Sequence, residues 1–205
     1  MILDKNIAWK RGRFFIPARR FASVTNIALT GDAMNKGISN GSPDTDGAPV
    51  AGDYGTTATE CWGISIAAAG DEIAHYMPIG GNWDTTQSFE FKVWFSHQST
   101  TADAPIWKVH TLFRTASGDA LLPILDNADE VMTFDAHTCS TTADVVEGTD
   151  WKRAVADVAG TNDLIGISVE CDDLGGASAD EIILIGLEVG FTVKATTTDN
   201  ARRVT

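Results

Sequence analysis

The sequence predicts an all-β protein, an antiparallel β-sandwich of the jelly-roll type with an N-terminal arm and long loops. Three observations predict it: apolar and polar residues alternate over many segments, long polar connections separate these segments, and only one segment has helical spacing. Strands that are apolar on one side must bury that side against a second sheet. Long strands with long connections favour a jelly roll over an up-and-down barrel.

The clearest alternation lies in residues 88–96, where every odd position is apolar and most even positions are polar. After a polar connection, residues 106–114 alternate again, with Lys108 and His110 on the side opposite the apolar residues. We predict two strands that pair with one another in an antiparallel manner across a long loop. The residues expected to face inward are Phe89, Phe91, Val93, Phe95, Trp107, Val109 and Phe113.

Two more strand pairs are predicted as hairpins. Residues 62–68 and 73–79 alternate on either side of a short turn, and residues 164–171 and 180–194 alternate on either side of a Gly-rich loop. The last strand is long enough to need a bend, which Gly186 and Gly190 allow. Its predicted inward face consists of Ile183, Ile185, Leu187, Val189, Phe191 and Val193.

The remaining segments are assigned more simply. Residues 21–29 and 120–125 are expected to be strands, with Pro123 keeping the second one at an edge or bulge. Residues 30–57 form the longest polar segment and are expected to be a loop that contacts a partner. One or two short strands are expected in 129–150. Residues 150–159 have an Asp N-cap and helical spacing, although a strand fits almost as well.

The 205 residues are expected to form one folded domain, residues 21–194, preceded by a basic-aromatic arm (1–20) and followed by a polar tail (195–205). The net charge is −13, but the arm holds six basic groups and one acidic group. The other 185 residues carry nine basic and 27 acidic groups. An acidic body repels nucleic acid and anionic membranes, so we expect neither as a partner, and any anionic partner would have to meet the arm.

The composition argues against membrane and disulfide-rich classes. No apolar run approaches the roughly 20 residues of a spanning helix, and the charged start does not resemble a secretion signal. We therefore expect the protein to be made in the cytoplasm and kept there until it is incorporated into a larger particle. Three cysteines without CxxC spacing are expected to be thiols.

No catalytic signature is present. The sequence lacks the Gly-rich nucleotide motifs, HExxH and GxSxG, and its paired carboxylates are adjacent, which points them to opposite faces of an extended chain. We therefore expect no enzyme activity, no cofactor and no metal. One segment keeps a minor calcium-loop alternative to a plain Asp/Gly turn, although Pro residues interrupt it and its last ligand is Asp rather than Glu. Its ligands would be Ser42, Asp44, Asp46 and Asp53, around Gly47.

Residues for partner contact are expected in two places. Trp94 is out of phase with the neighbouring phenylalanines and therefore lies on the opposite face, where it meets another protomer or lies beneath a loop. An exposed tryptophan is also typical of a carbohydrate platform. The arm supplies the other candidates, which are basic or aromatic: Trp9, Lys10, Arg11, Arg13, Phe14, Arg19 and Arg20.

Three segments together resemble the jelly-roll virion proteins of tailed bacteriophages: MPIGGNWD (77–84), the pair FKVWFSHQ (91–98) and APIWKVHTLF (104–113), and the strand pair in 163–193. The resemblance implies a structural virion component, for which we favour a capsid decoration or cement protein that stabilises the head. The implied partners are the major capsid protein and sister subunits, with a trimer favoured. The alternative is a tail-fibre or receptor-binding β-sandwich that binds carbohydrate. An enzyme on the same scaffold is the third hypothesis.

Overall fold

The computed structural model describes residues 11–18, 22–23, 50–54, 61–66, 68–81, 83–84, 87–115, 128–154, 164–178 and 181–193. Apart from one residue of 3₁₀ helix at Ala18, the regular structure in these ranges is β. Within the same ranges, no helix has the length and apolar character needed to cross a bilayer.

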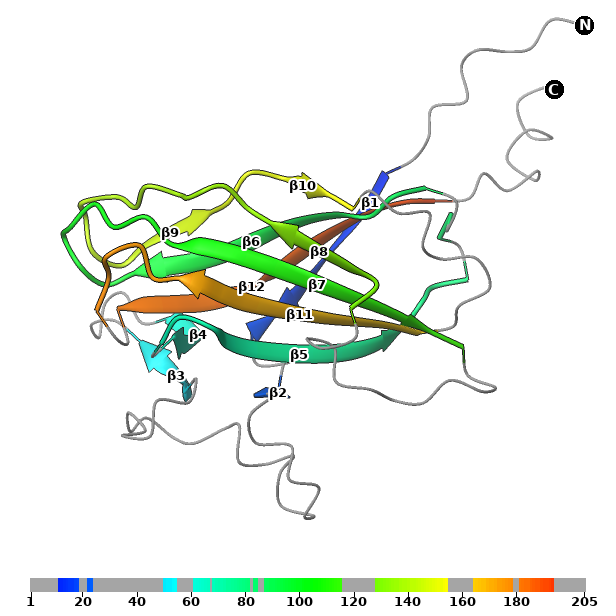
Figure 1. Cartoon of the computed structure of the whole chain (residues 1–205), viewed down its shortest axis with the longest axis horizontal. Coiled ribbons are helices and arrows are strands. Elements are labelled where there is room, and N and C mark those ends of the chain that lie inside the picture. The colour runs from blue at the N-terminus through cyan, green and yellow to red at the C-terminus, as the bar shows by residue number, and fades with distance from the viewer. Residues whose placement is uncertain are drawn as a thin grey trace, which may run out of the picture.

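The strands form two antiparallel sheets that lie face to face (Figure 1). Sheet A has the order β10 (Lys152–Arg153), β6 (Glu90–His97), β12 (Ile182–Thr192), β4 (Cys61–Ile66) and β3 (Val50–Tyr54). In the same sheet, β1 (Arg11–Pro17) pairs with β12, and β9 (Val145–Gly148) pairs with β6. Sheet B has the order β2 (Ala22–Ser23), β5 (Asp71–Pro78), β11 (Leu164–Asp173), β7 (Ile106–Arg114) and β8 (Glu130–Thr133). The predicted β-sandwich is therefore confirmed.

The core lies between the sheets and uses the inward faces that the alternation predicts. Phe91 and Phe95 of β6 and Trp107 and Val109 of β7 are 0% exposed. The rings of Phe95 and Trp107 meet across the two sheets, with their centroids 5.4 Å apart. Burying each of these side chains contributes about 1.5–3 kcal/mol relative to leaving it exposed, so the contact between sheets is the main stabilising element.

The three predicted strand pairings are wrong. The strands β4 and β5 belong to different sheets, as do β6 and β7, and also β11 and β12. The connections 67–70, 98–105 and 174–181 therefore cross from one sheet to the other. Alternation shows which side of a strand is buried, but the strands of both sheets have the same pattern, so it does not show to which sheet a strand belongs. A connection of a few extended residues spans the roughly 10 Å between sheets, so a short connection does not require a hairpin.

The predicted inward face of β12 is correct only in its second half. The register with β6 shifts between Leu184 and Gly186, which is a β-bulge. Before the bulge the core residues are Ile182 and Leu184, and after it they are Leu187 and Val189. One extra residue reverses the alternation, so Ile183 and Ile185, which we predicted to face inward, lie outside the core cluster between the sheets, although Ile183 is 0% exposed.

Part of the predicted arm is a strand of the sandwich. Residues 11–17 form β1, which pairs with β12 along its whole length, and Ile16 lies in the core. Residues 50–54, predicted as loop, form β3, and residues 152–153, for which we favoured a helix, form β10. Two short strands, β8 and β9, confirm the expectation for 129–150. Residues 1–10, 19–21, 24–30, 120–125 and 155–159 lie outside the described residues.

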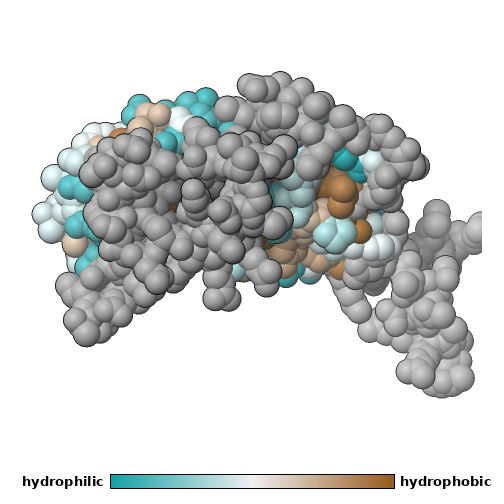
Figure 2. All heavy atoms as spheres, turned by 90° about the horizontal axis from the view of Figure 1, so that it is seen from below, coloured by the Kyte–Doolittle hydropathy of each residue, from teal (hydrophilic) through white to brown (hydrophobic). Residues whose placement is uncertain are grey.

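The side of the sandwich nearest β5 combines polar and apolar surface. Seen from below, hydrophobic residues form a brown area beside hydrophilic ones (Figure 2). Met77 and Ile79, at the end of β5, pack against the core but are only partly buried. The apolar packing between the two sheets thus continues to partly exposed side chains at the end of β5.

The strand β1 offers a direct test of its place in the sandwich. Replacing Ile16 by alanine should lower the free energy of unfolding by about 2–5 kcal/mol, because its side chain is 4% exposed and fills the core. Its neighbour Phe15 points outward and is 46% exposed, so Phe15→Ala should change stability by less than about 1 kcal/mol. Urea unfolding followed by tryptophan fluorescence measures both, and equal effects would argue against the strand.

Candidate functional site

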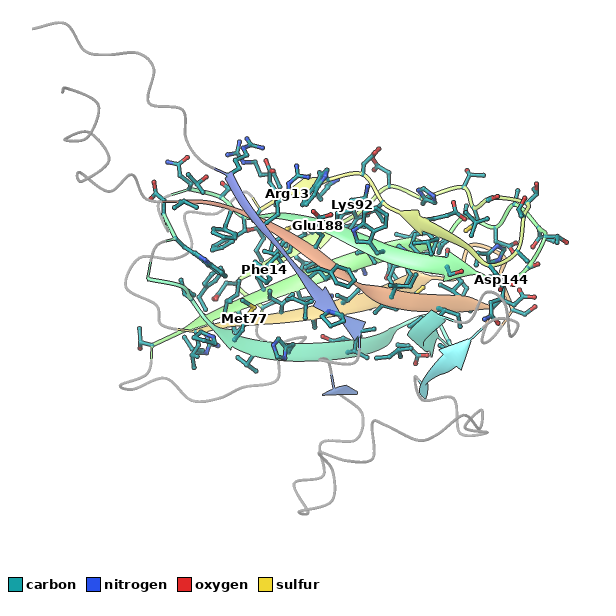
Figure 3. All side chains as sticks on the ribbon, turned by 180° about the vertical axis from the view of Figure 1, so that it is seen from behind. Arg13, Phe14, Met77, Lys92, Asp144 and Glu188 are labelled. Carbon is teal, nitrogen blue, oxygen red and sulfur yellow. The ribbon has the colours of Figure 1, made fainter. Side chains whose placement is uncertain are left out.

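The outer face of sheet A, the side turned away from sheet B, carries an unusual set of side chains. Three neighbouring strands contribute to it: Phe15 of β1 lies opposite Glu188 of β12, which lies opposite Lys92 of β6. These three residues form one row of register partners across the strands. Arg13 of β1 lies in the neighbouring row on one side, and Trp94 of β6 lies in the neighbouring row on the other side. Figure 3 shows Arg13, Lys92 and Glu188 gathered on this face.

Two glycines of β12 leave room for aromatic rings on this face. A side chain at Gly186 would lie 2.5 Å from the ring of Phe15, and one at Gly190 would lie 3.5 Å from the ring of Trp151. Glycine at these positions allows both rings to lie against the backbone of the central strand. The two glycines are four residues apart, which is about 13 Å along a strand.

Each tryptophan on this face is held by charged groups. The indole Nε1 of Trp94 donates a hydrogen bond to Glu188 Oε2 at 3.1 Å, and Lys92 Nζ lies 4.3 Å from the ring centroid. The guanidinium of Arg13 lies 4.4 Å from the ring centroid of Trp151. These cation–π contacts contribute about 0.5–1 kcal/mol each at exposed sites, so they orient the rings without fixing them firmly.

Ion pairs connect the same face across the strands. Arg11 Nη1 donates to both carboxylate oxygens of Glu90, at 3.0 and 3.1 Å, and Arg13 Nη1 lies 3.8 Å from Glu188 Oε1. Arg153 pairs in register with Glu90, and together with Arg11 it lines a shallow depression that ends at Phe191 and Thr192. Both arginines of the ion pairs are more than half exposed, so these bonds are weak and exchange readily with a ligand.

The charge of this face differs from that of the whole chain. Its strand residues include the basic Arg11, Arg13, Lys92 and Arg153 and the acidic Glu90 and Glu188. This gives a formal charge of +2 on a protein whose net charge is −13. A basic face on an acidic protein concentrates anionic ligands there.

The structure brings together three of the predicted contact residues and separates a fourth. Arg11, Arg13 and Trp94 share the outer face of sheet A, which combines the predicted arm with the predicted exposed tryptophan. Phe14 points the other way and stacks on Trp83 with centroids 5.4 Å apart. Trp9, Lys10, Arg19 and Arg20 lie outside the described residues.

Sequence reasoning missed the other members of this face. Trp151 was assigned to a helix, and Phe15, Lys92, Glu90 and Glu188 were not selected. The sequence offers one indication of this face: residues 90, 92 and 94 alternate with the core residues of the same segment and therefore point to the opposite side of the strand. The strand that supplies Glu188 could not be placed beside it from the sequence, because β6 and β12 are far apart in the chain.

The metal-ligating candidates fall in different places. Ser42, Asp44 and Asp46 of the predicted calcium loop lie outside the described residues, and Asp53 lies on β3, paired with Trp62. In the part of the chain that the structure describes, one group has three ligand atoms within 4.8 Å of one another: His97, Asp103 and Glu181.

His137 and Cys139 have the side-chain types of zinc ligands, and each has a different environment. His137 Nε2 lies 2.9 Å from Glu147 Oε2. Burial, together with the nearby carboxylates of Glu147 and Asp103, raises the pKa of the Cys139 thiol to about 12. The thiol is therefore protonated at neutral pH and is a poor ligand there.

The outer face of sheet B holds the residue types of an acyl-transfer triad. His110 Nε2 lies 2.7 Å from Glu170 Oε2, and Ser168 is the register partner of His110. Ser168 Oγ, however, makes no hydrogen bond to any described residue, and the serine is 0% exposed. A nucleophile needs contact with its base and access for substrate, so this geometry does not form a working triad.

No protein-family model and no curated protein matches the chain. Several solved structures match the chain at low sequence identity. The CBM22-1–GH10 modules of endo-1,4-beta-D-xylanase 10B from Clostridium thermocellum, complexed with xylohexaose, match 91% of this chain at 12% identity and TM-score 0.44. The CBM36-1 domain of a xylanase from the hindgut metagenome of Trinervitermes trinervoides matches 90% at 5% identity and TM-score 0.36.

The enzymatically active domain of tailspike protein 4 from bacteriophage CBA120 also matches, over 91% of this chain at 11% identity and TM-score 0.33. This chain covers all of the CBM36-1 domain, but only 28% of the xylanase chain and 20% of the tailspike chain. At these identities the likeness concerns the fold alone. The chain is a jelly-roll-like β-sandwich by its own two antiparallel sheets.

Proposed function

We propose that the chain is a non-enzymatic β-sandwich module that binds carbohydrate along the outer face of sheet A. The observation that carries the proposal is the shared placement of Trp94 and Trp151 on one face, each beside charged groups that can bind hydroxyls. This function is the alternative that the sequence suggested for Trp94. A virion decoration role is the second candidate.

The chemistry of this face fits a sugar chain. A pyranose ring has an apolar C–H face and a rim of hydroxyls, so it packs on an aromatic ring while polar side chains bind its edge. Glu188 accepts hydrogen bonds beside Trp94, and Arg13 donates beside Trp151. The rings lie near opposite ends of a segment of β12 about 13 Å long, which suits an oligosaccharide rather than a single sugar.

The charge of the face favours an anionic glycan, such as one that contains uronic acids. Arg11, Arg13 and Arg153 present guanidinium groups, which bind carboxylates in a bidentate geometry. Arg11 and Arg13 now contact the partly exposed Glu90 and Glu188, and a ligand carboxylate can replace these at little cost. We therefore expect tighter binding of polyuronates than of neutral chains of the same length.

The test is a glycan array followed by calorimetric titration with the best ligand. Trp94→Ala and Trp151→Ala should each weaken binding by about 30-fold or more, the loss typical of a central aromatic contact. Arg13→Ala should weaken binding of anionic glycans more than that of neutral ones. Val131→Ala is the control, because Val131 is 49% exposed on the other sheet.

Two outcomes would count against the proposal. One is the absence of binding to any glycan by a folded protein. The other is binding that Trp94→Ala and Trp151→Ala leave intact, because this would place the ligand elsewhere on the molecule.

The second candidate is a protein-docking role in a phage particle, which the resemblance in the sequence implies. The observation that favours it is Phe15, an aromatic residue 46% exposed on the same face. Exposed aromatics in the middle of a charged face are typical of protein interfaces. Cosedimentation with purified procapsids separates the two roles: binding that depends on Phe15 and is unaffected by glycans would favour docking.

A further inference from the structure

Three possible metal ligands meet where β6 ends and β12 begins, away from the proposed glycan face. His97 is the last residue of β6, Asp103 lies in the connection 98–105, and Glu181 immediately precedes β12. One nitrogen or oxygen atom from each lies within 4.8 Å of the other two. The three residues come from sequence positions that only the fold brings together.

The imidazole of His97 is the most informative member of this group. Its side chain is 0% exposed, and neither ring nitrogen makes a hydrogen bond to any described residue. Nε2 lies 3.0 Å from Asp103 Oδ2, which is a suitable distance, but the angles do not meet the requirements of a hydrogen bond. A buried polar atom without a hydrogen bond costs about 1–3 kcal/mol, so a ligand that binds a ring nitrogen here would stabilise the folded protein.

The distance of 3.0 Å between Nε2 and Oδ2 is compatible with two ligands of the same ion. Zinc lies about 2.0–2.2 Å from imidazole nitrogens and carboxylate oxygens, so neighbouring ligands are about 3.0–3.5 Å apart. An ion placed between the two atoms and Glu181 would satisfy the histidine and neutralise the two carboxylates at once.

Hydrogen bonds hold the two residues that carry the carboxylates in place. Thr101 Oγ1 donates to Asp103 Oδ2, and Cys139 N donates to the backbone oxygen of Asp103 at 2.8 Å. Glu181 Oε2 accepts from Ser178 N at 2.7 Å. Hydrogen bonds of this kind orient the side chains that bind a metal ion. Each carboxylate still has a free lone pair with which to bind the ion.

The backbone links the third ligand directly to the first. Gln98 N donates to the backbone oxygen of Glu181 at 2.8 Å, which fixes Glu181 beside the residue that follows His97. Asp103 and Glu181 are partly exposed, while His97 is buried. The open side of the group is therefore the carboxylate side, which gives an ion a way in from solvent.

We propose that His97, Asp103 and Glu181 bind a divalent transition metal, with zinc as the preferred ion. A neutral imidazole and two carboxylates suit zinc, whereas calcium prefers six to eight oxygens and rarely takes nitrogen. Three protein ligands leave a fourth position for water on the exposed side. The ion would join the connections 98–105 and 174–181 to the end of β6, so its role is to stabilise the loops at this end of the sandwich.

The test uses the untagged full chain, stripped with EDTA, and zinc chloride. Calorimetric titration and elemental analysis after dialysis should give one zinc per chain. Zinc at about 100 times its Kd should raise Tm by about 5–10 °C, through binding to the folded state only. Asp103→Asn, Glu181→Gln and His97→Gln should each weaken zinc binding at least 10-fold, and circular dichroism establishes that each variant is folded.

The matched control is His137→Gln, which removes a histidine whose Nε2 lies 2.9 Å from Glu147 but which belongs to no group of three ligands among the described residues. It should bind zinc as the parent does. Substoichiometric zinc, or zinc binding that Asp103→Asn and Glu181→Gln leave unchanged, would overturn the proposal. So would a thermal shift with calcium and none with zinc, because His97 would then not be a ligand.

Discussion

Replacing Trp107 by alanine should lower the free energy of unfolding by about 3–5 kcal/mol, a large part of the stability of a typical domain. Trp107 is 0% exposed and contacts Phe95 of the opposite sheet, with ring centroids 5.4 Å apart. Its indole nitrogen makes no hydrogen bond to any described residue, so the loss is one of packing alone. Urea unfolding followed by circular dichroism measures the change.

The control is the same substitution at Trp94, on the outer face of sheet A. Trp94→Ala removes a partly buried ring, one hydrogen bond to Glu188 and one cation–π contact with Lys92, and should cost about 1–2 kcal/mol. It should also weaken glycan binding, whereas Trp107→Ala should act on binding only through unfolding. Equal destabilisation by both substitutions would contradict the assignment of their faces.

These two tryptophans show what the sequence can predict. Trp94 and Trp107 lie in two alternating segments, and alternation follows from the geometry of a strand, in which successive side chains point to opposite sides. The sides assigned to both residues are confirmed. The two-layer fold follows from the same property, because half-apolar strands need a second sheet.

The pairing of strands could not be predicted in the same way. The turn between 66 and 71 suits a hairpin, yet β4 and β5 pair with β12 and β11, both far away in the chain. Partner choice depends on side-chain contacts between distant segments, and these are not visible in local patterns. The bulge at Leu184 and Gly186 shows the same limit, since one extra residue reverses the face of a whole segment.

The candidate sites depend on such distant contacts even more strongly. Glu188 meets Trp94 only because β12 lies beside β6. His97 meets Asp103 and Glu181 only because the connections 98–105 and 174–181 cross between the sheets at the same end of the sandwich. The sequence therefore selected Trp94 as an exposed aromatic but predicted neither its acidic partner nor a metal group that includes a histidine at the end of β6.

The turn at Gly175 should be the most sensitive backbone position at that end of the molecule. Gly175→Ala should destabilise the protein by about 2–5 kcal/mol, the sum of left-handed strain and steric overlap. Its φ is +64°, and an added Cβ would lie 2.0 Å from the carbonyl carbon of Ala104. Ala104 N donates to the backbone oxygen of Gly175 at 3.0 Å, so relieving the overlap would also break this bond between the two connections.

The same substitution at Gly70 distinguishes the left-handed strain from the steric overlap. Its φ is +87°, but no atom lies within 4 Å of an added Cβ, so Gly70→Ala carries only the left-handed strain, about 1–2 kcal/mol. Chemical denaturation of both variants measures the difference, which reports the close approach of connections 98–105 and 174–181. Because Asp103 lies in the first of these, Gly175→Ala should also weaken zinc binding while Gly70→Ala leaves it unchanged. Equal stability of the two variants would mean that the connections do not approach one another this closely.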